Sequence, residues 1–74
     1  MAKVILESWR EGLEKVSLTR LQMDKLGISL KESKSNVDSL LEDEKIILEI
    51  DDENLAIEFF KEAEIIGVNC KLLP

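Results

Sequence analysis

Side chains that could carry out catalysis are scarce in this sequence. The 74 residues include one Cys and no His, so a Ser-His-Asp or Cys-His catalytic group is excluded. The single thiol, Cys70, can form no internal disulfide and, without His, no zinc site. Because Cys70 alternates with Val68 and Leu72 in an apolar run, we expect it to be a small buried hydrophobic residue rather than a nucleophile.

Two acidic clusters are the remaining candidates for chemistry. Residues 51–53 (Asp-Asp-Glu) could form a carboxylate site for a metal, but they lack the spacing and the glycine of a calcium loop. Capping of a helix explains them better, and residues 42–44 (Glu-Asp-Glu) are expected to form a solvated turn. The three scattered glycines make no phosphate-binding loop. We therefore expect a protein that is not an enzyme and that uses no metal and no cofactor.

Local signals mark where the helices begin and end. Gly27 follows a run without Gly or Pro and is placed for a left-handed helix end. Ser29 and Glu32 have the spacing of a capping box, which predicts that a second helix begins at Leu30. Asp51 or Asp52 is expected to cap a third helix, which ends at Gly67. The first two helices are therefore separated by only a short turn.

Three strands and three helices are expected, in the order strand, helix, helix, strand, helix, strand. Three one-sided helices can cover one face of three amphipathic strands. The sequence thus predicts one domain over residues 1–74, an α+β two-layer sandwich with three helices on one face of a three-stranded, mainly antiparallel sheet. The expected ranges are 3–9, 45–50 and 68–73 for the strands and 13–26, 30–41 and 53–66 for the helices.

Charge is distributed unevenly along the chain, whose net charge is −6. Residues 1–34 contain seven basic and five acidic side chains, whereas residues 35–74 contain three basic and eleven acidic ones. The acidic total argues against general nucleic-acid binding. Apolar runs of about three residues are far short of the ~20 needed to cross a bilayer, and no secretion signal opens the chain. We expect a cytoplasmic protein with no direct nucleic-acid or membrane partner.

The first expected helix carries two apolar rows rather than one. Leu18, Leu21 and Leu26 suit the core. Val16, Thr19, Arg20 and Met23 form a second row that points largely the other way, beside Lys15. A monomer has no internal use for the second row, so we interpret it as a contact surface for another protein.

Several segments make the chain recognisable. Lys15-Val16 opens the first helix, residues 26–34 read LGISLKESK, and Val37 follows. Together with residues 4–6 (VIL) and residues 56–72 (AIEFFKEAEIIGVNCKL), these segments occur in the order found in one known domain. The chain resembles the C-terminal domain of the bacterial ribosomal stalk protein (L-seven/L-twelve), and the match is most specific within residues 26–34.

The resemblance implies that the first two helices form a face that contacts GTPase translation factors. By position, Lys15, Arg20 and Lys34 would be its basic members and Val16 an apolar member, with Leu30 and Glu32 nearby. Three departures weaken this contact or alter the turn: Thr19 replaces an aliphatic residue, Met23 an arginine and Ser29 a glycine. The expected partner-binding residues are Lys15, Val16, Thr19, Arg20, Met23, Leu30, Lys31 and Lys34.

Two further expectations concern organisation and alternatives. The family's N-terminal helical segment and hinge do not precede residue 3 here, so we expect a free-standing relative or an excised domain. A ClpS-type protease adaptor would share the architecture, although its N-terminal stretch and specificity pocket are not evident. A structural or regulatory oligomer is the third alternative. It would form through the open sheet face, where we expect Ile5, Ile47, Trp9 and Leu73 to support a weak homodimer.

Overall fold

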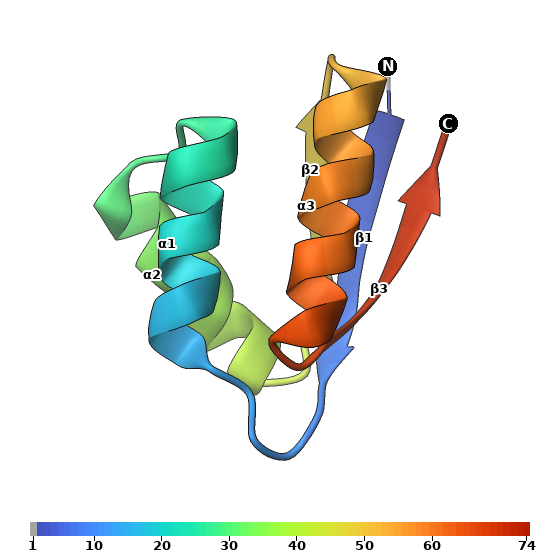
Figure 1. Ribbon diagram of the computed structural model, residues 1–74. Helices are drawn as coiled ribbons and strands as arrows, with labels where there is room; N and C mark the ends of the chain where they lie inside the picture. The colour runs from blue at the N-terminus through green and yellow to red at the C-terminus, as the bar shows by residue number, and fades with distance from the viewer. Residues whose placement is uncertain (1) are drawn as a thin grey trace.

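The computed structural model describes residues 2–74. The chain folds as an α+β domain in the order β-α-α-β-α-β, as predicted (Figure 1). No described helix has both the length and the apolar composition needed to cross a membrane. The elements are β1 (Ala2–Trp9), α1 (Lys15–Leu26), α2 (Leu30–Leu41), β2 (Ile46–Ile50), α3 (Glu53–Ile65) and β3 (Val68–Leu73).

The sheet has the strand order β2-β1-β3, and both pairings are antiparallel. On the central strand, Ile5 lies directly opposite Ile47 of β2 and opposite Lys71 of β3. The register of β1 with β3 shifts between Leu6 and Ser8, so β1 contains a bulge there. Near the end of β1, the alternation of its side chains between the two faces of the sheet therefore shifts by one residue.

The bulge corrects one prediction about the open face. Beyond the bulge, Trp9 pairs with Val68, which is fully buried. Directly opposed residues of a ladder point to the same face, so Trp9 lies at the edge of the helix-covered side. Its side chain is 40% exposed. The expectation that Trp9 belongs to the open face, together with Ile5 and Ile47, was wrong.

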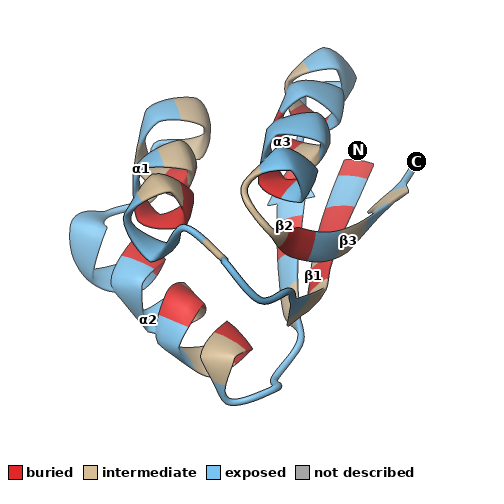
Figure 2. Ribbon diagram, turned by 60° about the horizontal axis from the view of Figure 1, so that its bottom comes forward, coloured by how far each residue is buried: buried red, intermediate tan, exposed pale blue. Residues whose placement is uncertain are grey.

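The core lies between one face of the sheet and the helices. Alternate residues of β1, namely Ala2, Val4 and Leu6, are buried (Figure 2). They are covered by fully buried helical side chains such as Phe59 and Leu40. Helices α2 and α3 pack directly on the sheet, whereas α1 packs on α2 and, less extensively, on α3. The α1 helix is thus the element farthest from the sheet.

Four of the six helix ends lie where the sequence signals predict, and α3 ends at Ile65, one residue earlier than predicted. Gly27 adopts φ 67° in the left-handed region and closes α1. The Ser29 hydroxyl accepts a hydrogen bond of 3.1 Å from the Glu32 amide at the start of α2. The Asp52 carboxylate accepts from the amides of the first turn of α3. Helix α1 begins at Lys15, two residues later than predicted.

The loop between β1 and α1 is fastened to the turn between α3 and β3. The Arg10 amide donates to the Gly67 carbonyl at 2.8 Å, and the Glu14 amide donates to the Ile66 carbonyl at 3.0 Å. The Arg10 guanidinium also donates to the carbonyl oxygens of Glu64 and Val68. The Arg10 guanidinium places a positive charge at the carbonyl end of α3 and so stabilises that helix. The backbone hydrogen bonds fix the position of the loop and the start of α1.

Candidate functional site

A groove runs between α1 and α2 on the outer side of the helical layer. Two adjoining hollows form it, and they share Val16, Thr19 and Lys34. The larger hollow has a volume of about 380 Å³. We call this feature the basic groove; its lining residues are Lys15, Val16, Thr19, Arg20, Met23, Asp24, Leu30, Lys34, Val37 and Asp38.

The structure brings together seven of the eight residues that the sequence predicted for partner binding. The exception is Lys31, which is exposed on α2 but does not line the groove. One of the seven is placed differently from the prediction. Thr19 is 9% exposed, and its hydroxyl donates to the Lys15 carbonyl at 3.0 Å. Thr19 therefore forms part of the floor and has little surface to offer a partner.

Apolar side chains are exposed at the groove. Val16 is 73% exposed and Leu30 is 49% exposed, and Met23, which is partly buried, lines the same hollow. Val16 and Met23 are seven residues apart on α1 and so project from the same side of that helix. These residues give the groove apolar surface that no other part of the described chain covers.

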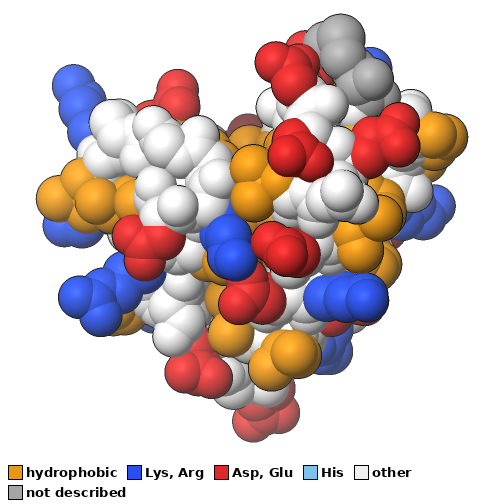
Figure 3. Space-filling model, turned by 45° about the horizontal axis from the view of Figure 1, so that its top comes forward, with side chains coloured by type: hydrophobic (Ala, Val, Ile, Leu, Met, Phe, Trp, Pro, Cys, Tyr) orange, Lys and Arg blue, Asp and Glu red, His pale blue; other side chains and the backbone are white. Residues whose placement is uncertain are grey.

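The basic side chains of the groove are free to pair with a partner. Lys15, Arg20 and Lys34 are exposed, and none makes an ion pair within residues 2–74. Lys25, near the end of α1, behaves differently because its ammonium lies 3.5 Å from Glu58 and 3.7 Å from Glu62. Two acidic residues, Asp24 and Asp38, also line the groove. Figure 3 shows Lys and Arg side chains projecting beside hydrophobic ones at the left, where α1 and α2 lie, with acidic side chains among them and elsewhere on this face.

Behind the groove, a buried polar network joins α1 to α2. The Gln22 side chain is fully buried and its amide donates to the Ser33 carbonyl at 3.2 Å. Asn36 donates to Gln22 Oε1 at 2.8 Å. The sequence analysis did not identify this network, although Gln22 lies four residues after the core residue Leu18, a spacing that places both on one helix face. The network fixes how the two walls of the groove are aligned.

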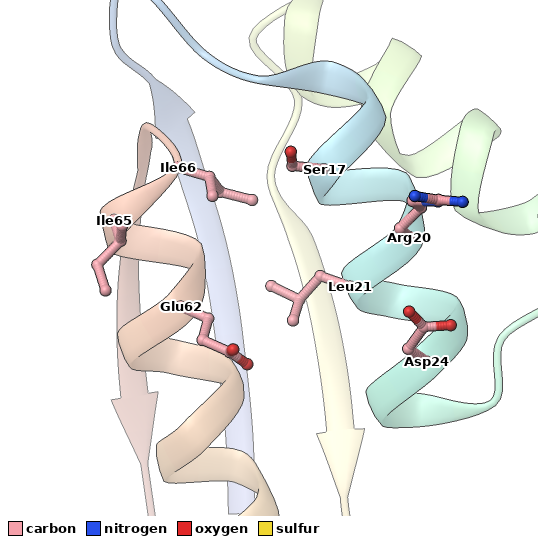
Figure 4. A pocket seen from close by; sticks show the side chains of 7 residues that line it. All are labelled: Ser17, Arg20, Leu21, Asp24, Glu62, Ile65 and Ile66. Carbon is pink, nitrogen blue, oxygen red and sulfur yellow. The ribbon is translucent and has the colours of Figure 1, made fainter.

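A separate hollow, outside the basic groove, lies on the side of α1 that faces α3 (Figure 4). Leu21 and Ile66 point toward each other across it, and Glu62 reaches in from α3. Its volume is about 370 Å³. Because Arg20 and Asp24 line both this hollow and the basic groove, α1 forms a ridge between two depressions. Nothing in the sequence analysis identified the second one.

Two observations on the described residues concern possible metal ligands and the single thiol. Within residues 2–74, no three His, Cys, Asp or Glu side chains are placed to hold a metal ion. Cys70 is half-buried, with Sγ 3.7 Å from the Phe60 carbonyl. Burial, and then the charge of Glu64, raise the pKa of the Cys70 thiol to about 11. A thiol with a raised pKa is a poor nucleophile at neutral pH.

Comparisons with protein-family models, curated proteins and solved structures find no match for this chain.

Proposed function

We propose that this chain is a non-enzymatic protein-interaction domain, and that its basic groove binds an acidic surface of a partner protein. The observation that carries the proposal is the combination of unpaired cations and exposed apolar side chains in one groove. Lys15, Arg20 and Lys34 make no internal ion pair, and Val16 and Leu30 are exposed beside them. An apolar centre surrounded by a polar rim is the usual make-up of a protein interface.

The partner that we favour is a GTPase translation factor. The support is the resemblance of residues 26–34 and the Lys15-Val16 pair to the C-terminal domain of the ribosomal stalk protein, whose first two helices contact such factors. In this chain the corresponding helices are α1 and α2. The domain would thus act in or near translation, with a face altered at Thr19 and Met23.

Charge and apolar contact have separate effects in this interaction. Exposed cations accelerate the encounter with an acidic surface and select against basic ones, and salt screens them. Burial of Val16 and Leu30 by the partner supplies affinity that does not depend on salt. We therefore expect binding that weakens at high ionic strength and retains a salt-independent remainder.

Binding to purified elongation GTPases tests the proposal. We expect the double variant Lys15→Glu/Arg20→Glu to bind at least tenfold more weakly than the wild type, since it reverses two charges in the groove. The matched control is Lys45→Glu/Lys61→Glu, which changes the net charge equally at two exposed lysines outside the groove. Titration calorimetry at low and high salt would measure both. Equal loss in the two variants, or no binding by the wild type, would refute the proposal.

A further inference from the structure

The open face of the sheet carries a repeated pattern on two neighbouring strands. Residues 3–7 read KVILE and residues 45–49 read KIILE, so each segment has the form Lys-x-Ile-x-Glu. Side chains two residues apart on a strand share a face, and the buried residues of β1 and β2 are the intervening ones. The outward members are Lys3, Ile5 and Glu7 on β1, and Lys45, Ile47 and Glu49 at β2.

The register aligns the two copies of the pattern in opposite directions. Lys3 lies opposite Glu49, and Ile5 lies opposite Ile47. The ladder ends at the pair of Leu6 with Ile46, and Glu7 and Lys45 are the next residues beyond that pair. The patch on β1 and β2 therefore has isoleucines at its centre and alternating charges at its corners, and these two segments contribute no net charge to it. Lys71 of β3 lies on the same face opposite Ile5, so the whole face has one excess positive charge on a chain with a net charge of −6.

The apolar centre of this patch is exposed. Ile47 of β2 is 61% exposed, and Ile5 beside it is partly exposed. The Glu7 carboxylate forms an ion pair with the Lys71 ammonium of β3, at an Oε2–Nζ distance of 3.7 Å. Glu7 therefore also faces outward. The helices pack on the other face, where the core residues of β1 lie.

We propose that this patch, the Lys-Ile-Glu face, pairs with the same patch of a second copy of the chain. One two-fold axis within the plane between the sheets, running along the strands between β1 and β2, satisfies the pattern. It brings Lys3 over Glu49 of the second copy and Ile5 over Ile47. Every lysine of β1 and β2 then meets a glutamate, while Lys71 of β3 lies outside the overlap, so the patch on these two strands is complementary to itself, as a symmetric dimer requires.

The size of the face limits the strength of the dimer. The two overlapping strands, about 4.8 Å apart and about five residues long, give a flat area on the order of 160 Å² per copy. A standard stable interface buries about 800 Å² per partner, so we expect a dissociation constant on the order of 0.1 to 1 mM. The helices remain on the outside of this dimer, and each copy keeps its basic groove accessible. The dimer itself does not depend on the proposed function of the groove.

Sedimentation equilibrium of the purified chain without any partner tests the dimer. From about 20 µM to about 1 mM, in the range where such affinities become visible, we expect the apparent mass of the wild type to rise above 8.4 kDa. Ile47→Lys places a charge at the centre of the Lys-Ile-Glu face and should hold the mass at that of the monomer. The control Ile65→Lys changes the charge equally at a side chain on α3 that is 81% exposed, and it should behave as the wild type does.

A second variant separates the charge pattern from the apolar contact. Lys3→Glu brings an acid over Glu49 of the second copy, and we expect the dissociation constant to rise at least fivefold. Lys61→Glu makes the same charge change on α3 and should leave the constant within twofold of wild type. A wild type that stays monomeric throughout, or an Ile47→Lys variant that dimerises as the wild type does, would overturn the proposal. Equal weakening by Lys3→Glu and Lys61→Glu would overturn the charge complementarity.

Discussion

Asn36 of α2 donates a hydrogen bond of 2.8 Å to Gln22 Oε1 of α1, on the buried side of the two helices that form the basic groove. Gln22 in turn donates to the carbonyl oxygens of Ser33 and Leu18, at 3.2 and 3.3 Å. One glutamine side chain thus connects three points, two of them on the facing helix. Helix α1 is the element farthest from the sheet, so its position depends strongly on these contacts with α2.

We expect Gln22→Ala to lower the free energy of unfolding by about 2 to 3 kcal/mol, because it leaves buried polar groups unpaired and opens a cavity. Urea unfolding followed by circular dichroism would measure the loss. Ser35→Ala is the control, since Ser35 is an exposed α2 residue outside the network, and its stability should equal or slightly exceed that of the wild type. A loss under 0.5 kcal/mol for Gln22→Ala would contradict the role that we assign to the network.

The order and ends of the elements could be predicted because their signals are local. Gly27 at the end of α1, Ser29 at the start of α2 and Asp52 at the start of α3 each act within one turn of the chain. The face on which Trp9 lies could not be predicted in the same way. It depends on a bulge in β1 relative to β3, and β3 is nearly sixty residues away in sequence.

Which residues of α1 line the basic groove could also be predicted from local spacing. How deeply each of them is buried could not. Val16, Arg20 and Met23 share a side of α1 by helical spacing alone, and the structure gathers them in one hollow. The degree of burial of Thr19 depends on how closely α2 approaches, which spacing on α1 does not reveal. The Lys-x-Ile-x-Glu repeat is plain in the sequence, but its complementarity appears only once the register of Ile5 with Ile47 is known.

Gly67 is the position at which the structure gives the strongest steric reason for a glycine. It adopts φ 112°, and a Cβ at this position would lie 2.9 Å from the Cα of Leu13, which is in the loop between β1 and α1. We expect Gly67→Ala to lower the free energy of unfolding by about 3 kcal/mol, through strain and this backbone clash together. Thermal and urea denaturation would measure it.

Gly12 offers a matched control for the clash. It also has a positive φ, 92°, but a Cβ there would meet nothing within 4 Å. Gly12→Ala should therefore cost only the conformational strain, about 1 kcal/mol. If both alanine variants lost the same stability, the contact of Gly67 with Leu13 would not be the cause.

The Cys70 thiol should be unreactive in the folded protein. Its pKa is raised to about 11, chiefly by burial and next by Glu64, so the thiolate fraction at pH 8 is small. We expect alkylation by iodoacetamide at pH 8 to be at least tenfold slower in the folded chain than in urea. The rate in the folded chain should also keep rising above pH 9, where an ordinary thiol levels off. A folded-state rate that levels off near pH 8.5 would show that the thiol is not perturbed.

Met23 is the position at which a substitution should strengthen partner binding. It lines the basic groove together with Arg20 and Leu30, and in the stalk domain that the chain resembles an arginine stands at this position. If the groove binds an acidic surface of a GTPase translation factor, Met23→Arg adds a charge-assisted contact, and we expect about tenfold tighter binding, measured by titration calorimetry.

The control for Met23→Arg is Asn54→Arg, which adds the same charge at an exposed position on α3. Long-range attraction alone would strengthen the binding of both variants by a similar factor. That factor would fall with added salt, because charges farther apart than about 10 Å are screened at 0.1 M salt. A direct contact instead predicts that only Met23→Arg gains and that its dissociation slows more than its association accelerates. Equal gains, or a loss for Met23→Arg, would mean that the partner's acidic surface does not lie over this part of the groove.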